Sequence, residues 1–177
     1  TFSFNEKKIL DIAAATKELG AEMFVLDDGW FGKRNNDKAG LGDWYVNEKK
    51  LPGGLGTLIE RVNAVGLKFG IWYEPEMISP DSELIKTHPE WVMQIKGRKP
   101  TETRWQLMLD LTNPEVCEFV YNSVADVLKT TNIDITFYEM KKVDENTLQV
   151  EASLIYKAHS YHDRYEQIKN IFLKNDD

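Results

Sequence analysis

The sequence has a single cysteine, Cys117, among its 177 residues, so it cannot form an intramolecular disulfide. One free thiol favours a reducing compartment, and we therefore expect the protein in the cytoplasm. No window approaches the roughly 18 consecutive apolar residues of a membrane-spanning helix, so no membrane partner is expected. The chain begins with Thr1 and shows no signal-peptide pattern, which is consistent with a segment of a longer product.

Positive charge is also scarce. Lys and Arg number 22 against 29 Asp and Glu, which gives a formal net charge of −7. Binding to nucleic acid needs a surplus of Lys and Arg on one face, so this balance argues against a nucleic-acid partner. Hydrophobic residues make up 42% of the chain, enough for one core, and we expect residues 1–177 to form a single domain.

What is present is an alternation of helix and strand patterns. Asn5 can cap a first helix over residues 6–19, which Gly20 would end. Its inward residues are expected to be Ile9, Ile12, Ala13 and Leu19. Short apolar runs predict three strands, at Met23–Leu26, Leu67–Tyr73 and Ile133–Tyr138. Three further helices are expected around Leu58–Val65, from Asn113 onward, and around Tyr161–Phe172.

This order predicts an α/β fold with parallel strands joined by right-handed crossover helices. The long segments, residues 27–54 and 74–113, both follow strand ends, which is where such folds place functional loops. A closed eight-unit barrel takes about 250 residues. The chain is therefore expected to form a partial (β/α)8 barrel of the TIM type, roughly half of one.

The strongest motif is the run LDDGWFGKR at residues 26–34. Asp27 and Asp28 are adjacent acids at the end of a buried strand, a costly arrangement unless they face solvent or bind donors. Sugar hydroxyls are such donors, and the C–H face of a sugar stacks on an indole. The alternative is a simple strand-end turn formed with Gly29.

Further runs follow in order: LGDW at 41–44, LPGGL at 51–55, FGIWYEPEM at 69–77, SPDS at 79–82, HPEW at 88–91 and LDLTNPEV at 109–116. Together they closely resemble the α-galactosidases of glycoside hydrolase family 36. The resemblance extends from about residue 4 to residue 134, and residues 135–177 form a divergent tail.

The resemblance implies a retaining α-galactosidase that cleaves terminal α-1,6-galactosyl residues from melibiose or raffinose-type sugars, without a cofactor or metal. By matching position, Asp27 and Asp28 bind galactose hydroxyls, while Trp44 and Arg104 contact the sugar. A single Trp in a loop is more often a packing residue than a ligand contact, and this alternative stays open for Trp44. Glu74 could equally orient neighbouring polar groups or form structural ion pairs.

The pattern departs from the family where catalysis is expected. The family's nucleophile is the Asp of a Lys-Trp-Asp-Met-Asn-Arg motif, whereas residues 133–142 of this chain read IDITFYEMKK. Alignment places Glu139 at the nucleophile position and Phe137 at the Lys position. The extra methylene of Glu shifts the carboxylate, and a displacement on the order of 1 Å can cost roughly a hundredfold in rate. No match to the family's acid/base Asp occurs within the chain.

Two interpretations therefore stay open. The chain is either a piece of a catalytic α-galactosidase or a non-catalytic half-barrel that is truncated, degenerate or engineered. In the second case it would bind a small oligosaccharide or assemble with itself. An open parallel sheet has unpaired edges, so we expect a homo-oligomer.

Overall fold

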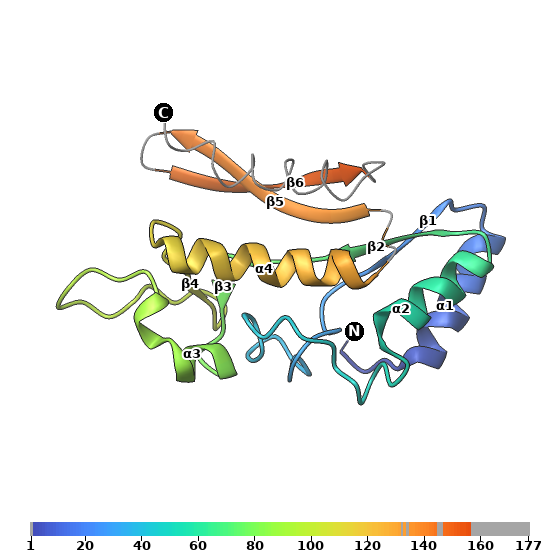
Figure 1. Ribbon diagram of the computed structural model, residues 1–177, viewed down its shortest axis with the longest axis horizontal. Coiled ribbons are helices and arrows are strands. Elements are labelled where there is room, and N and C mark those ends of the chain that lie inside the picture. Colours follow the sequence, from blue (N-terminus) through green and yellow to red (C-terminus); the bar gives the residue numbers. More distant parts are fainter. Residues whose placement is uncertain (1, 132, 134, 145–146, 157–177) are drawn as a thin grey trace.

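The computed structural model describes residues 2–131, 133, 135–144 and 147–156 (Figure 1). The helix expected around Tyr161–Phe172 lies outside the described residues. Along the chain the elements are α1 (Glu6–Glu18), β1 (Met23–Leu26), α2 (Gly54–Ala64), β2 (Lys68–Trp72), β3 (Met77–Ile78), α3 (Glu83–Thr87), the 3₁₀ turn η1 (Pro89–Trp91), β4 (Leu107–Met108), α4 (Pro114–Thr130), β5 (Ile135–Asp144) and β6 (Thr147–Tyr156).

The first helix begins as the sequence predicts, because the Asn5 side chain accepts a hydrogen bond from the Lys8 N–H at 3.0 Å. Its inward face is narrower than expected. Ile9 and Ala13, one turn apart, are buried, but Ile12 and Leu19 are 52% and 88% exposed, so their predicted burial is wrong. The helix packs mainly against α2, and this single contact covers only one stripe of its surface.

Three strands of the main sheet are parallel, as predicted. The sheet order is β1-β2-β5-β6, with β1 and β5 on either side of β2. The predicted third strand begins at Ile135 rather than Ile133. Phe69 and Ile71 of β2 are fully buried, as expected for a central parallel strand covered on both faces.

The sheet has a fourth strand, β6, which the sequence analysis did not predict and which is not parallel to the others. Strand β6 runs antiparallel to β5, and only residues 145–146 separate them. A connection this short permits a hairpin but not a crossover, which needs a dozen or more residues. The hairpin falls in the stretch of sequence that departs from the family pattern.

The long segment between β2 and α4 contains a second, two-stranded sheet and two short helices. Strands β3 and β4 pair antiparallel, with α3 and η1 beside them (Figure 1). These elements share a second hydrophobic core with α4, formed by Ile78, Leu84, Trp91, Val92, Leu107, Leu109, Val116 and Val120.

The described part of the chain contains no helix long and apolar enough to cross a membrane.

Candidate functional site

The sheet register places the candidate residues at one edge. Leu26, the last residue of β1, pairs with Ile71, and Trp72, the last residue of β2, pairs with Phe137. Asp27 and Asp28 follow β1 directly. The carboxyl ends of parallel strands meet at the same edge of a sheet, so this edge gathers the acids that the sequence singled out.

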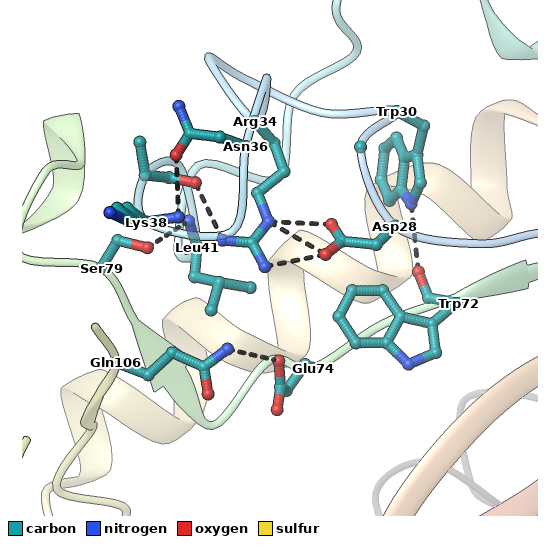
Figure 2. A network of polar contacts seen from close by, with 12 residues as sticks. Asp28, Trp30, Arg34, Asn36, Lys38, Leu41, Trp72, Glu74, Ser79 and Gln106 are labelled. Carbon is teal, nitrogen blue, oxygen red and sulfur yellow. Dashed lines mark hydrogen bonds and ion pairs between the residues drawn. The ribbon is translucent and has the colours of Figure 1, made fainter. Parts of the chain in front are cut away.

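Asp28 is held by a buried arginine. Arg34 Nε donates to Asp28 Oδ1 at 2.9 Å, and Arg34 Nη2 donates to Oδ2 at 2.7 Å (Figure 2). Arg34 Nη1 donates to the carbonyl of Ala39 at 3.1 Å. The side chain of Arg34 is 3% exposed and that of Asp28 is 18% exposed. This bidentate pair fixes the carboxylate while part of it still faces solvent. Asp27, by contrast, is exposed.

Sequence reasoning missed Arg34. Its only signal was its place at the end of the run LDDGWFGKR, six residues after Asp28. Periodicity does not reveal such a pair, because a loop rather than a helix or strand brings the two side chains together.

A buried lysine, Lys50, connects two backbone positions of the loop that follows β1. Lys50 Nζ donates to the carbonyls of Gly29 at 2.7 Å and Arg34 at 2.8 Å, and lies 4.9 Å from the centre of the Phe4 ring. Burial lowers the pKa of Lys50, and the charge of Asp28 partly offsets this effect. The lysine thus joins the two ends of the segment that carries the Asp28–Arg34 pair.

Glu74, just beyond β2, extends the polar network. Gln106 Nε2 donates to Glu74 Oε2 at 3.3 Å (Figure 2). Burial raises the pKa of Glu74. The positive charges of Arg34 and Arg104 oppose this rise, while the negative charge of Asp28 adds to it. The charge of Arg34 therefore acts on both carboxylates, Asp28 after β1 and Glu74 after β2.

Arg104 lies on the exposed turn before β4, and its backbone φ is 53°. Gln106, two residues further along the chain, donates to Glu74, so the turn that holds Arg104 lies near the carboxyl end of β2. Its contact with a sugar stays a prediction.

Trp44, which the family resemblance places against the sugar, is largely enclosed by other aromatic side chains, and its contact with a sugar stays a prediction. It is only 6% exposed and packs against the rings of Phe31, at 4.3 Å between centroids, and Tyr73, at 4.9 Å. Its Nε1 has no hydrogen-bond partner among the described residues. Packing is the role that the structure shows for Trp44.

Another indole, that of Trp72 at the end of β2, is partly exposed. The carbonyl of Trp72 accepts a hydrogen bond from Trp30 Nε1 at 3.1 Å.

Asp43, next to Trp44 in the LGDW run, has a structural role. Its carboxylate accepts hydrogen bonds from the backbone N–H groups of Glu83 and Leu84, at 2.9 Å and 3.0 Å. It therefore helps to cap α3 from a distant loop and connects the segments that follow β1 and β2.

Glu139 lies on β5, where its backbone pairs with Ala152 of β6 and a register shift follows between Glu139 and Lys141. It is two residues beyond Phe137, the last β5 residue paired with β2. Its position on β5 is therefore past the carboxyl end of β2. Its role as nucleophile stays a prediction.

Metal ligation finds no support in the described ranges, which hold no group of three or more His, Cys, Asp and Glu side chains placed to bind an ion. The arrangement that is present combines carboxylates, guanidinium groups and a partly exposed indole. These groups are suited to a neutral ligand rich in hydroxyls.

Comparison with known proteins agrees with this chemistry. The α-galactosidase AgaA of Geobacillus stearothermophilus is 47% identical over 141 residues, which are 80% of this chain and 19% of AgaA. The galactosidase domain of the α-galactosidase–sucrose kinase AgaSK superposes with a TM-score of 0.77 at 42% identity, covering 98% of this chain and 23% of that one. An AgaA variant in complex with raffinose gives a TM-score of 0.76 at 40% identity, covering 97% of this chain and 23% of that one.

The chain therefore spans about a fifth of the length of the relatives that it matches. A family model described as Melibiase matches residues 1–173, nearly the whole chain. On this evidence of sequence and structure, the chain belongs to the melibiase family.

Proposed function

We propose that this chain forms the galactose-binding sector of an α-galactosidase active site. The observation that carries the proposal is the buried Arg34–Asp28 pair beside the exposed Asp27, at the carboxyl end of β1. The relatives are α-galactosidases, and one of them is known in complex with raffinose. The substrate class is that of terminal α-1,6-galactosides such as melibiose and raffinose.

The proposed binding mode follows from the geometry. Asp28, with both oxygens oriented by Arg34, accepts hydrogen bonds from sugar hydroxyls without having to be ordered first. Asp27, which is exposed, contributes a second pair of acceptor oxygens. Arg104 donates to ring or glycosidic oxygens from the opposite loop.

For catalysis with retention, Glu139 occupies the nucleophile position. Its carboxylate would attack the anomeric carbon as the bond to the leaving-group oxygen breaks, and a second carboxyl group would protonate that oxygen. Water would then hydrolyse the glycosyl-enzyme ester. In this proposal the second carboxyl group comes from outside the 177 residues, and no cofactor takes part.

The runner-up is a non-catalytic module, favoured by one observation. Strand β5 pairs with β6 in an antiparallel hairpin instead of leading into a further parallel unit. On this reading, residues 1–177 are a single-domain half-barrel, with a family-like part over 1–134 and a divergent tail, which binds the sugar or associates with further copies in the cytoplasm.

Sugar binding is tested by calorimetric titration of the 177-residue chain with methyl α-D-galactoside, and with the matching glucoside as its 4-epimer. Asp27→Asn and Asp28→Asn should each weaken galactoside binding about tenfold or more, because hydrogen bonds to a charged group are lost. Asp11→Asn, an exposed acid on α1, should leave binding unchanged. Absence of binding by the unaltered chain, or equal affinity for both epimers, would overturn the galactose site.

Catalysis is tested separately with 4-nitrophenyl α-D-galactoside, whose leaving group departs as the phenolate and therefore needs no acid from outside the 177 residues. Turnover that disappears in Glu139→Gln would support the nucleophile assignment. Galactose binding without turnover, in a chain that unfolds cooperatively, would favour the non-catalytic module.

A further inference from the structure

Buried hydrogen bonds join the loop after β1 to the segment after β2. The N–H of Gly40 donates to the carbonyl of Asp81 at 2.8 Å. The Leu41 N–H donates to Ser79 Oγ, and the Ser79 N–H donates to the Leu41 carbonyl, each at 3.1 Å. Leu41 and Ser79 are both fully buried. Backbone groups in such surroundings need partners, so each of the two segments fixes the position of the other.

Asp43 anchors this junction. It is 4% exposed, and its carboxylate accepts hydrogen bonds from the N–H groups of Glu83 at 2.9 Å and Leu84 at 3.0 Å. Its own N–H donates to the carbonyl of Gly40 at 3.1 Å. A Cβ atom on Gly32 would lie only 2.7 Å from the Cβ of Asp43, so the two parts of the loop touch there. Asp43 therefore connects residues 32 and 40 of this loop to the beginning of α3.

The same junction reaches the Asp28–Arg34 pair. Arg34 Nη1 donates to the carbonyl of Ala39, directly before Gly40, at 3.1 Å. A Cβ atom on Gly40 would lie 2.8 Å from the backbone nitrogen of Arg34, so the two residues are in close contact. Arg34 in turn donates to both oxygens of Asp28 (Figure 2). A contiguous series of contacts thus runs from Asp43 through residues 39–40 to the carboxylate of Asp28.

An exposed ion pair joins the same two segments but is the weaker connection. Lys33 Nζ lies 2.6 Å from Glu83 Oε1, with side chains 69% and 43% exposed. Exposed pairs of this kind contribute little, whereas a buried carboxylate that accepts two N–H groups forms strong, charge-assisted hydrogen bonds. The connection between the loop and α3 therefore depends on Asp43.

We propose that Asp43 is a positioning residue of the galactose site. By joining the loop after β1 to α3, it holds the Ala39 carbonyl where that carbonyl orients Arg34, and Arg34 orients the Asp28 carboxylate. This inference rests on the proposed galactose site. Without the anchor, the Asp28 carboxylate has to be ordered when the sugar binds, and this cost weakens affinity. The Asp43 oxygens are occupied by the N–H groups of α3, so Asp43 acts through Arg34 and not on the sugar.

The test separates positioning from simple capping of α3. Ser82 is the matched control, because its Oγ accepts a hydrogen bond from the Ile85 N–H at 3.2 Å and caps the same helix from within its own segment. Methyl α-D-galactoside is titrated calorimetrically into the 177-residue chain and its variants. We expect Asp43→Ala to weaken binding about 5- to 10-fold and Ser82→Ala to leave it within about twofold. Asp43→Asn keeps an oxygen that can accept from both N–H groups, so it should recover part of the loss.

A second readout follows the Asp28–Arg34 pair without any sugar. The Arg34 Nε–H is enclosed and donates to Asp28 Oδ1 at 2.9 Å, so its hydrogen should exchange slowly with water, as measured by NMR on an isotope-labelled chain. Asp43→Ala should speed this exchange about tenfold or more, whereas Ser82→Ala should change it by less than about twofold. Capping of α3 alone would not produce this difference.

Two results would overturn the positioning role. One is an equal loss of galactoside affinity in Asp43→Ala and Ser82→Ala, and the other is unchanged exchange of the Arg34 Nε–H in Asp43→Ala. If Asp43→Ala does not unfold cooperatively, the comparison of Asp43→Asn with Ser82→Ala decides the question in the same way. An unaltered chain that binds no galactoside would overturn the galactose site, while the Arg34 exchange would still show whether Asp43 orients the pair, so the two failures are distinguishable.

Discussion

At the scale of single residues, the site depends on buried charges that satisfy one another. Arg34 and Asp28 form a bidentate pair in which the guanidinium group is almost fully enclosed. Removing one member of such a pair leaves the other without its partner in a poorly solvated position, which costs more than the pair itself contributes.

Arg34→Met should therefore destabilise the chain by about 2–4 kcal/mol and weaken galactoside binding, because Asp28 loses its orientation. Urea unfolding and calorimetric titration measure the two effects. Arg61→Met is the control, since the Arg61 side chain is 56% exposed in its pair with Glu6, and this substitution should cost no more than about 1 kcal/mol. Equal losses in the two variants would contradict the role assigned to Arg34.

Glu74 makes stability depend on pH. Burial raises its pKa above the ordinary value of 4.5, so the folded chain binds this proton more tightly than the unfolded chain. The contribution of Glu74 is fully present below about pH 4.5 and is lost as the pH rises through the raised pKa. Glu74→Gln should therefore gain stability relative to the unaltered chain between pH 4.5 and 7, as measured by thermal unfolding at a series of pH values. A difference that stays constant over this range would contradict the assignment.

At the scale of elements, the loop after β1 is organised by Lys50. One ammonium group satisfies the carbonyls of Gly29 and Arg34, which would otherwise be buried without donors. The adjacent Lys49 is exposed and offers a matched control.

Lys50→Met should destabilise the chain by about 1–3 kcal/mol and raise amide hydrogen exchange over residues 29–34, because two carbonyls lose their partner. Lys49→Met should change neither quantity. Slow exchange retained across this loop in Lys50→Met would show that the aromatic packing beneath it, and not the lysine, holds the loop.

At the scale of the whole molecule, the described sheet ends at β1, which pairs with β2 on one side only. An open strand edge is prone to pairing with another chain, and charged side chains on it oppose that pairing. We expect the 177-residue chain to sediment as a dimer or larger species. Val25→Lys, on β1, should shift it toward the monomer, whereas Val65→Lys, equally exposed but at the end of α2, should not. A chain that is monomeric without substitution would contradict this expectation.

The parallel strands, the helices that begin after Asn5 and Asn113, and the family could all be predicted from the amino-acid sequence. The sequence also singled out Asp27 and Asp28, whose contacts with a sugar stay a prediction. These features depend on local periodicity, capping residues and short motifs, all of which involve residues that are close together in the sequence. Which side chains meet depends on the three-dimensional packing of the loops. The fold buried Trp44, left Ile12 exposed, paired Arg34 with Asp28 and brought Lys38 to Trp105. Such contacts join loops that are distant in sequence, and their geometry follows from packing rather than from any repeating pattern.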